Sequence, residues 1–427
     1  MSHLNITVIG GGSLGTSLGF LLSGLTGESV TVIEMEDEVG RNYSGRNEGI
    51  VHRPFFLPPG AADLTAATWI NSYEAWREAS MYFSGSWVVR GMLYIAQNEE
   101  QAKSLDVYRR WGVSHGMSED ELLVLEGDEI SRIEDGVTGD AALFSRSEGS
   151  VSYARLLKGL AGLAEEQGCR FVYGCRAKVT KRARRMLVTC GEHELETDLL
   201  INSAGGSSLD ILKQTGKGED LTELYAGGVY YRLSTRPVKE HNVYLVPSNP
   251  RFPFTDPHIV LKPDGTNVLG PRPILVSGPY NYEDGLLELV KAALVYITKS
   301  WFEGYEILRD KSLKNALAEN WRSLFGAGEM IRKMSRYVRN LSESQIEGEE
   351  FRGLRHMLIS KREGLISEPW VWIAENEVHV LNFDGPGATG APAFAMMLLN
   401  QLISDGIVKP KDRADMKLWK GLAGMCL

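Results

Sequence analysis

The chain has 427 residues and a formal net charge of -9. Its hydrophobic fraction of 43% and charged fraction of 24% are ordinary for a globular protein, which excludes extensive disorder and a fibrous repeat. The length favours two domains. We expect no nucleic-acid partner, because binding a polyanion requires a basic surface.

The four cysteines are scattered without CxxC spacing, at Cys169, Cys175, Cys190 and Cys426. We therefore expect no metal site and no dithiol redox chemistry, and four scattered thiols fit a reducing compartment. We expect no cleaved secretory signal, and no stretch reaches the about 20 apolar residues of a transmembrane helix. These features predict a cytoplasmic protein.

The last segment, residues 407–427, alternates basic and apolar side chains. Two interpretations stay open for it. It contacts the inner face of a membrane peripherally, or it packs on the protein's own body, which is the interpretation we favour.

The first 34 residues predict a βαβ unit. Ile6–Ile9 is a short apolar strand, Gly10–Gly15 is a glycine turn, Thr16–Leu25 has the spacing of a buried helix, and Val30–Ile33 is a second strand. A crossover helix of this kind joins parallel strands.

Helices and short strands alternate over the next part of the chain. Helices are predicted at Ala66–Ser80 and Asn98–Trp111, around a strand-like run at Trp87–Ala96. An amphipathic helix at Tyr153–Gln167 stops at Gly168. Four strands follow, at Phe171–Tyr173, Val179, Leu187–Thr189 and Leu199–Asn202, and the basic run Lys181–Arg185 is read as a solvated hairpin tip between the middle two.

From about Leu221 to Phe351 the pattern changes, which predicts a second domain. The predicted strands are Gly228–Leu233, Val243–Val246, His258–Leu261 and Ile274–Val276, and the predicted helices are Leu287–Lys299 and Lys311–Ala318. The chain closes with a hairpin (Val371–Ala374 and Val378–Asn382), the turn DGPGATGAP and a helix at Phe394–Ile403.

The glycine turn carries the pattern G-x-G-x-x-G directly after a strand. Gly10 permits the tight turn, Gly12 lets the backbone approach a pyrophosphate, and Gly15 lets the helix pack on the strand. Glu34 ends the second strand, where a carboxylate binds a ribose diol. The strand, the turn, the helix and the acid together predict a dinucleotide site rather than a purely structural turn.

Two further segments favour FAD over NAD. The polar segment Arg41–His52 follows the ribose acid and would run along the diphosphate toward a flavin ring. Asp198–Gly206 is an apolar strand that ends in small residues, as close packing against a dinucleotide requires. A single NAD-binding unit needs neither segment.

The chain carries further segments in a characteristic order, at Ser44–His52, Tyr244–Pro247, Pro253-Phe254, His258, Gly270-Pro271, Gly353–Arg355, Val378–Asn382 and Pro386–Thr389. In this order the sequence resembles the D-amino-acid-oxidase-like superfamily of FAD-dependent oxidoreductases, and within it the L-2-hydroxyglutarate oxidases and dehydrogenases. The resemblance covers nearly the whole chain.

The resemblance implies an α/β fold with a discontinuous, Rossmann-like FAD-binding domain and an inserted α+β substrate domain built on an antiparallel sheet. We assign residues 1–85, 140–215 and 355–427 to the first domain and residues 86–139 and 216–354 to the second. The FAD-binding residues that it implies are Gly10, Gly12, Gly15, Glu34, Ser44, Arg46, Asn47, Val179, Ala204, Gly205, Gly387, Ala388 and Thr389.

The implied reaction is oxidation of a 2-hydroxy acid, with L-2-hydroxyglutarate as the leading substrate. The chemistry needs a base for the hydroxyl proton, hydride transfer to flavin N5 and a cation for the substrate carboxylate. His52 is the first candidate base, with His258 and then His356 as rivals, although a solitary His is more often structural. Arg355 is the candidate carboxylate anchor. Arg272 would bind a second carboxylate, and a surface salt bridge is the equal alternative.

The sequence also departs from the family pattern. Arg46-Asn47-Glu48-Gly49 stands where the family usually has His-Asn-Ser-Gly, and this adds a cation and an acid near the expected flavin. Arg272 replaces the Asn of a Gly-Pro-Asn turn, and Ser152 replaces the Asp of a Val-Asp pair. These changes bear on both the substrate and the electron acceptor, which we expect to be a quinone or dioxygen.

Two alternatives to a hydroxy-acid enzyme stay open. The first is an amino-acid or amine oxidase on the same scaffold, where a neutral amine needs no base. The second is a non-catalytic subunit that binds flavin without turnover.

Overall fold

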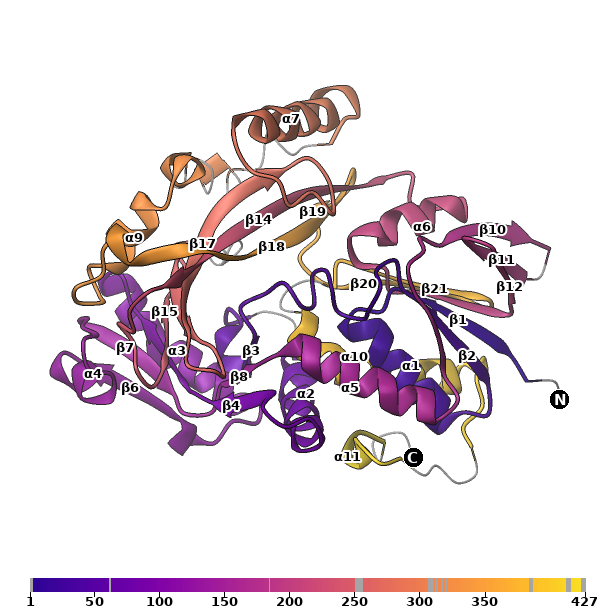
Figure 1. Ribbon diagram of the computed structural model, residues 1–427, viewed down its shortest axis with the longest axis horizontal. Helices are drawn as coiled ribbons and strands as arrows, with labels where there is room; N and C mark the ends of the chain where they lie inside the picture. The colour runs from indigo at the N-terminus through magenta and orange to yellow at the C-terminus, as the bar shows by residue number, and fades with distance from the viewer. Residues whose placement is uncertain are drawn as a thin grey trace.

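The computed structural model describes residues 3–60, 63–183, 185–249, 256–305, 311, 314–315, 318, 321–383, 387–411 and 416–423. The chain forms two halves side by side, each built on a large sheet (Figure 1). Some predicted features lie outside the described residues, namely Pro253-Phe254, Pro386, Arg184 of the predicted hairpin tip and half of the predicted helix Lys311–Ala318.

The first half is built on a six-stranded sheet. Its order is β20 (Trp370–Ala374), β21 (Glu377–Leu381), β13 (Leu199–Asn202), β1 (Asn5–Ile9), β2 (Ser29–Ile33) and β9 (Arg170–Val172). All neighbours are parallel except β20 and β21. The chain leaves β1 toward β2 on one side while β13 lies on the other, and such a reversal of strand order is where parallel sheets bind ligands.

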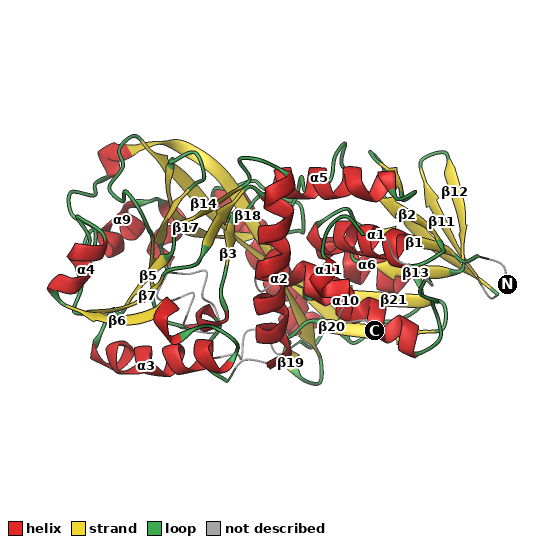
Figure 2. Cartoon of the chain, turned by 90° about the horizontal axis from the view of Figure 1, so that it is seen from below, coloured by secondary structure: helices red, strands yellow, loops and turns green. Residues whose placement is uncertain are grey.

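Both faces of the six-stranded sheet are covered. On one face lie α1 (Ser13–Leu25), α5 (Tyr153–Glu166), α10 (Gly387–Ser404) and α2 (Asp63–Tyr82), and Figure 2 shows α2 standing between the two halves. On the other face the meander β10 (Lys178–Arg182), β11 (Arg185–Cys190) and β12 (His193–Thr197) packs with α6 (Ser208–Gln214). The βαβ prediction is confirmed.

The second half is built on a nine-stranded sheet. Its order is β19 (Gly364–Leu365), β18 (Ile346–Ser360), β14 (Leu221–Leu233), β17 (Asn267–Val276), β16 (His258–Leu261), β15 (Asn242–Leu245), β5 (Met92–Ile95), β7 (Ala141–Ser145) and β6 (Leu122–Glu126). Every neighbouring pair is antiparallel except β15 and β5. The predicted fold class is therefore confirmed.

Smaller elements complete the two halves. Helices pack around the nine-stranded sheet at α3 (Glu99–Ser114), α4 (Asp128–Ile133), α7 (Leu286–Ile297) and α9 (Gly328–Met334). A three-stranded sheet is formed by β3 (Ile50–Val51), β8 (Gly149–Val151) and β4 (Trp87–Val89). The short helix α11 (Lys420–Ala423) lies near the C-terminus.

The structure contains elements that the sequence patterns did not indicate. The longest is β18, which pairs with β14 along its whole length, and its first half is too charged and exposed to show an apolar pattern. The predicted domain boundary between residues 354 and 355 falls inside this strand, and β7, predicted in the FAD-binding domain, pairs within the nine-stranded sheet. The domain division itself stays a prediction.

Two local predictions are wrong. The last predicted helix begins at Gly387 instead of Phe394, because Pro392 is tolerated within α10, so part of the expected turn is helical. Cys175 and Cys190, expected to be scattered thiols, form a disulfide. They lie at the base of the β10–β11 hairpin, whose pairing brings together two residues that are separated in sequence.

The described part of the C-terminal segment packs on the body of the protein. Met416, Leu418 and Trp419 are buried, and the Trp419 indole N–H donates to the carbonyl oxygen of Ala75 at 2.8 Å. The favoured interpretation of residues 416–423 is thus confirmed, while residues 412–415 and 424–427 lie outside the description. Among the described helices, none combines the length and the apolar character needed to cross a bilayer.

Candidate functional site

The glycine turn after β1 has a geometry that only glycine can adopt. Gly10 has a φ of +102°, and a Cβ there would lie 2.5 Å from the carbonyl oxygen of Ser203 on the neighbouring strand. A Cβ on Gly15 would collide with the carbonyl oxygen of Gly10. The turn is therefore held close against both the first helix and β13, which leaves the space above it open.

Glu34 and Ser44 close the two sides of this turn. The Glu34 carboxylate accepts hydrogen bonds from the backbone N–H groups of Gly11 at 2.6 Å and Glu36 at 2.9 Å. Burial raises the pKa of Glu34, while these N–H groups oppose the rise. Ser44 accepts a hydrogen bond at 2.9 Å from the N–H of Ser13 in the first turn of α1. These contacts tie the segment after β2 to the helix N-terminus.

A cavity lies above the glycine turn, between the two halves. Its walls come from both sheets and from the loop after β2, and they include Gly10, Gly12, Glu34, Tyr43, Ser44, Cys175, Arg176, Ala177, Ala204, Gly205, Tyr280, His356 and Phe383. His356 is buried, and neither of its ring nitrogens has a hydrogen-bond partner among the residues that the structure describes. Its ring packs edge-on against Tyr43. Burial, and then the charge of Arg355, lower the pKa of His356 to about 4, so its imidazole is neutral.

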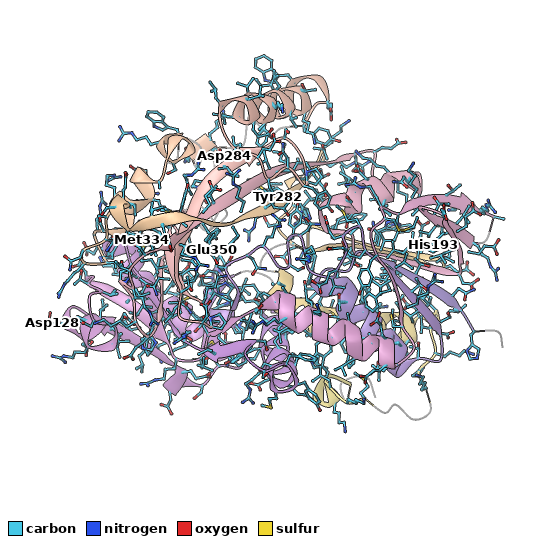
Figure 3. The ribbon with its side chains drawn as sticks, viewed as in Figure 1. Asp128, His193, Tyr282, Asp284, Met334 and Glu350 are labelled. Carbon is cyan, nitrogen blue, oxygen red and sulfur yellow. A yellow bond between two sulfur atoms is a disulfide. The ribbon has the colours of Figure 1, made fainter. Side chains whose placement is uncertain are left out.

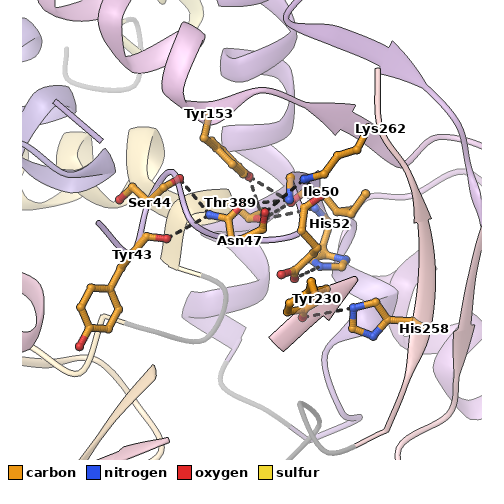
Figure 4. Close-up of polar contacts among 12 residues, drawn as sticks. Tyr43, Ser44, Asn47, Ile50, His52, Tyr153, Tyr230, His258, Lys262 and Thr389 are labelled. Atoms are coloured by element: carbon orange, nitrogen blue, oxygen red, sulfur yellow. Dashed lines mark hydrogen bonds and ion pairs between the residues drawn. The ribbon is translucent and has the colours of Figure 1, made fainter. Parts of the chain in front are cut away.

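A second cluster surrounds His52, which follows β3. The His52 ring is buried and stacked on Phe56, with 4.0 Å between the ring centroids. Its backbone N–H donates to the Thr389 hydroxyl at 3.3 Å, which ties β3 to the first turn of α10 (Figure 4). Neither ring nitrogen makes a hydrogen bond within the described part of the chain, although the Nε2 atom lies 3.7 Å from Glu48 Oε1.

The Glu48 carboxylate lies close to His52 and His258, and both histidines affect its pKa. Burial would raise its pKa, but His52 and the charge of His258 outweigh burial and lower the pKa to about 2. The Lys262 ammonium donates to the backbone carbonyl oxygens of Glu48 at 3.0 Å and Asn47 at 3.3 Å (Figure 4). The loop that carries Glu48 is therefore clamped, and Glu48 is charged beside the His52 imidazole.

The pKa of His52 is set by opposing effects. Burial lowers the pKa, Glu48 raises it, and the charge of Arg355 lowers it. The net direction is downward, so His52 is neutral at pH 7 and a ring nitrogen can accept a proton.

His258 and Arg355 reach the same cluster from the nine-stranded sheet. His258 on β16 stacks on Tyr244 with 4.0 Å between centroids, and its Nε2 atom lies 3.4 Å from the Tyr230 hydroxyl. Burial lowers the pKa of His258 to about 4. Arg355 on β18 lies close enough to His52 and Tyr230 for its charge to lower the pKa of both groups. The first two candidate bases and the candidate anchor are thus brought together.

The family of this protein is shown by a match over nearly the whole chain. A model of the family described as "DAO: FAD dependent oxidoreductase" matches residues 5–401. The chain belongs to this family. It is an FAD-dependent oxidoreductase, and the glycine turn, the buried Glu34 and the unpartnered His356 nitrogens of the cavity fit FAD.

Individual proteins are similar to this DAO-family chain over nearly its full length. The L-2-hydroxyglutarate dehydrogenase of Indibacter alkaliphilus is 25% identical over 392 residues, covering 90% of this chain and 95% of the relative. The L-2-hydroxyglutarate dehydrogenase of Escherichia coli K12 is 23% identical over 405 residues, covering 91% of this chain and 90% of the relative.

Solved structures share the DAO-family fold. The dithionite-reduced L-alpha-glycerophosphate oxidase of Mycoplasma pneumoniae with FAD bound has a TM-score of 0.71 at 17% identity, covering 97% of this chain and 98% of that one. Glycine oxidase of Geobacillus kaustophilus has a TM-score of 0.68 at 13% identity, covering 98% of this chain and 97% of that one. At these identities the likeness shows the fold alone.

The predicted FAD residues divide into two groups. Gly10, Gly12, Glu34, Ser44, Ala204 and Gly205 line the cavity, and Gly15 supports it from behind. Sequence reasoning missed Cys175–Ala177, Tyr280 and His356, which also line it. Only the position of His356 next to Arg355 gave a signal in the sequence.

The other predicted FAD residues are not among the residues that line the cavity. The Val179 N–H donates to the Gln214 side chain at 2.8 Å, and the Asn47 amide bonds to carbonyl oxygens of its own loop. The Arg46 guanidinium lies over the Tyr282 ring. Gly387, Ala388 and Thr389 form the start of α10 beside His52. Their roles toward FAD stay predictions.

Arg272 lies apart from the His52 cluster. It is buried on β17, where it forms an ion pair with Asp284, and its Nε atom donates to the Tyr231 hydroxyl at 2.8 Å. These residues line a second cavity near the start of α7, away from the glycine turn. Arg272 is buried in this ion pair while Asp284 is partly exposed, and the predicted contact of Arg272 with a substrate carboxylate stays a prediction.

Proposed function

We propose that this enzyme oxidises a 2-hydroxy acid to the corresponding 2-oxo acid, with L-2-hydroxyglutarate as the leading substrate. The observation that carries the proposal is the buried, neutral His52 imidazole, which lies 3.7 Å from the charged Glu48 in a cluster with His258 and Arg355. Relatives named L-2-hydroxyglutarate dehydrogenase, which align with at least 90% of the chain, support the substrate class.

His52 would act as the base for the substrate hydroxyl. A neutral imidazole accepts the proton, and a carboxylate beside it stabilises the imidazolium that forms. Bound FAD supplies the acceptor for the hydride that leaves the substrate carbon. His258 is the weaker candidate, because burial lowers its pKa to about 4.

Arg355 would bind the substrate carboxylate. A guanidinium offers two parallel donors to a planar carboxylate, and this pairing orients the neighbouring carbon as well as holding it. Arg355 projects from β18, a strand paired along its length with β14, which supplies a rigid support. Gly387, Ala388 and Thr389 would lie beside the flavin ring at the start of α10.

A second candidate function is oxidation of an amino acid or an amine. The observation that favours it is Glu48, whose pKa of about 2 makes it an anion beside His52. An anion there would attract a substrate ammonium group and repel the second carboxylate of a diacid. This chain has Glu48 at the position of the serine in the family's usual His-Asn-Ser-Gly pattern.

The electron acceptor and the cellular setting are also proposals. A quinone or dioxygen would take the electrons from the flavin. A quinone is dissolved in lipid, so a cytoplasmic enzyme that uses one needs peripheral contact with the membrane.

Anaerobic titration of the purified holoprotein tests the two functions. L-2-Hydroxyglutarate and a panel of 2-hydroxy monoacids are compared with L-glutamate and glycine, following the flavin's visible absorbance, 2-oxo acid and ammonia. Bleaching by a hydroxy acid without ammonia supports the first function. Bleaching by an amino acid with ammonia supports the second, and a flavin that none of them bleaches contradicts both.

A further inference from the structure

A short segment of the second half reaches the cavity above the glycine turn. Residues 279–282 lie between β17 and α7, and Figure 3 shows Tyr282 near the boundary between the two halves. The Tyr43 hydroxyl donates to the carbonyl oxygen of Pro279 at 2.5 Å, and the Tyr282 hydroxyl donates to Asn42 Oδ1 at 3.2 Å. We call residues 279–282 the strap.

The strap lies directly on the segment that follows β13 in the first half. The Tyr280 hydroxyl donates at 3.1 Å to the carbonyl oxygen of Ala204, and both residues line the cavity. A Cβ on Gly206 would lie 2.5 Å from the Tyr43 hydroxyl oxygen and 2.8 Å from Pro279 Cβ. A glycine at this position therefore lets the strap approach the first half closely.

Arg176 lies beside the strap at the rim of the cavity. It is an exposed residue of the segment between β9 and β10, and its guanidinium lies over the Tyr280 ring, 5.5 Å from the ring centroid. At this distance a cation is attracted to an aromatic face. Burial raises the pKa of Tyr280, the charge of Arg176 opposes this rise, and the charge of Glu34 adds to it. Tyr280 is therefore close to both Arg176 and Glu34.

The charge of Arg176 is not neutralised by a neighbouring acid. Among the described residues, two arginines line the cavity, Arg41 and Arg176. Arg41 forms ion pairs with Asp37 at 3.2 Å and with Glu38 at 3.4 Å. Arg176 forms no ion pair with an acid in the part of the chain that the structure describes. Its guanidinium is thus available to an anion in the cavity, and a diphosphate is such an anion.

We propose that the strap and Arg176 close the ADP end of the FAD site and retain the bound cofactor. The glycine turn and Glu34 line the same cavity, and they are the groups that the diphosphate and the ribose of a dinucleotide require. Arg176 would bind the diphosphate, and Tyr280 would keep the strap fastened to the first half. Release of FAD would then require Tyr280 to detach from Ala204.

This inference depends on neither the substrate nor turnover, because it concerns only the retention of FAD. The rate of FAD dissociation is measured by mixing holoprotein with an excess of isotopically labelled FAD and following exchange of the bound cofactor by mass spectrometry. FAD affinity is measured by titration into apoprotein at low and high salt. We expect the affinity of the unmodified protein to weaken as salt is raised, because salt screens the attraction between Arg176 and the diphosphate.

Two variants of Tyr280 test the strap. Tyr280→Ala removes the ring beneath Arg176 and the hydrogen bond to Ala204, so the rate of FAD dissociation should rise at least about tenfold. Tyr280→Phe keeps the ring and loses only the hydrogen bond, so the rate should rise about threefold. The matched control is Tyr82→Ala, because the Tyr82 hydroxyl also donates to a backbone carbonyl oxygen, that of Lys417 at 2.7 Å, but Tyr82 does not line the cavity. This control should release FAD as the unmodified protein does.

One variant of Arg176 tests the charge. Arg176→Gln should lower FAD affinity about tenfold at low salt and remove most of the salt dependence. Its matched control is Arg155→Gln, which makes the same change in net charge at an exposed arginine of α5 that does not line the cavity. Arg155→Gln should bind FAD as the unmodified protein does.

Two outcomes overturn the proposal. The first is a rate of FAD dissociation in the Tyr280 variants that is no faster than in Tyr82→Ala. Tyr280→Phe preserves the aromatic packing, so it decides this comparison if Tyr280→Ala does not fold. The second is an FAD affinity of Arg176→Gln at low salt that equals the affinity of Arg155→Gln.

Discussion

The glycine turn and the His52 cluster are built in opposite ways. The turn, with Gly10, Gly15 and Glu34, comes from one short stretch of chain, and each part is positioned by the strand or helix next to it. The cluster brings His52 together with His258 and Arg355, which belong to distant strands of the nine-stranded sheet. The glycine turn is thus a local unit, whereas the groups proposed to act on the substrate depend on long-range strand pairing.

The largest effect is expected at the glycine turn, with Gly15→Ala. The new methyl group would lie 1.8 Å from the Gly10 carbonyl oxygen, so the backbone of the turn would have to shift. We expect FAD affinity to fall at least 100-fold, on the order of 3 kcal/mol. The measurement is FAD titration into apoprotein.

A helix glycine elsewhere provides the control. Gly162 lies in α5, and no neighbouring group comes within 4 Å of the place that an alanine methyl would take. Gly162→Ala should keep FAD binding and raise the free energy of unfolding by roughly 0.5–1 kcal/mol. If Gly15→Ala binds FAD as tightly as this control, the close-packed turn is not required.

The next effect concerns the long-range cluster, with Arg355→Ala. Loss of a charge-assisted hydrogen bond to the substrate carboxylate should raise KM about 100-fold and leave FAD content unchanged. Steady-state kinetics on the best substrate measure this. Arg352→Ala is the matched control on the same strand, because Arg352 pairs with Glu349 and should leave KM within about twofold. Equal KM values in both variants would remove Arg355 from the site.

A smaller effect is expected from Glu48→Gln. The Glu48 carboxylate raises the pKa of His52, so its removal lowers that pKa further. His52 must be neutral to accept a proton, and activity is lost as pH falls through its pKa. The acid limb of kcat/KM should therefore move to lower pH by about one unit, while kcat falls about tenfold because the imidazolium is less stabilised.

A pH profile and an NMR titration of the His52 ring measure this prediction. Glu350→Gln is the control, since Glu350 pairs with Arg232 and is not among the groups that shift the pKa of His52. An acid limb that stays in place in Glu48→Gln would show that Glu48 does not act through His52.

The smallest effect on catalysis is expected from Arg272→Ala. Arg272 is buried with Asp284, so its loss leaves a partly buried carboxylate without its main partner and should lower the free energy of unfolding by about 3 kcal/mol. KM for L-2-hydroxyglutarate should change less than about twofold. Denaturant unfolding and kinetics are measured together, and a tenfold rise in KM would restore Arg272 as the anchor of a second carboxylate.

Sequence reasoning succeeded for elements that local interactions specify and failed for features that depend on pairing between distant residues. The βαβ unit, the helix at Tyr153–Glu166 with its stop at Gly168, and the hairpin β20–β21 were predicted because each shows its own periodicity or turn residue. The strand β18 was not, since its charged first half becomes a strand only by pairing with β14. The disulfide between Cys175 and Cys190 was missed for the same reason, because hairpin pairing creates it.

The sequence by itself determined the glycine turn and the order of the segments, because local spacing and residue type can be read along the chain. Its resemblance to the family supplied the candidate residues His52, His258 and Arg355. Only the tertiary structure decided that Glu48 is charged beside His52, that Arg272 is neutralised by Asp284, and that the strap of the second half reaches the cavity above the glycine turn. Burial and pairing between distant segments set the charge and the exposure of a side chain, and these properties do not exist until the sheets have assembled.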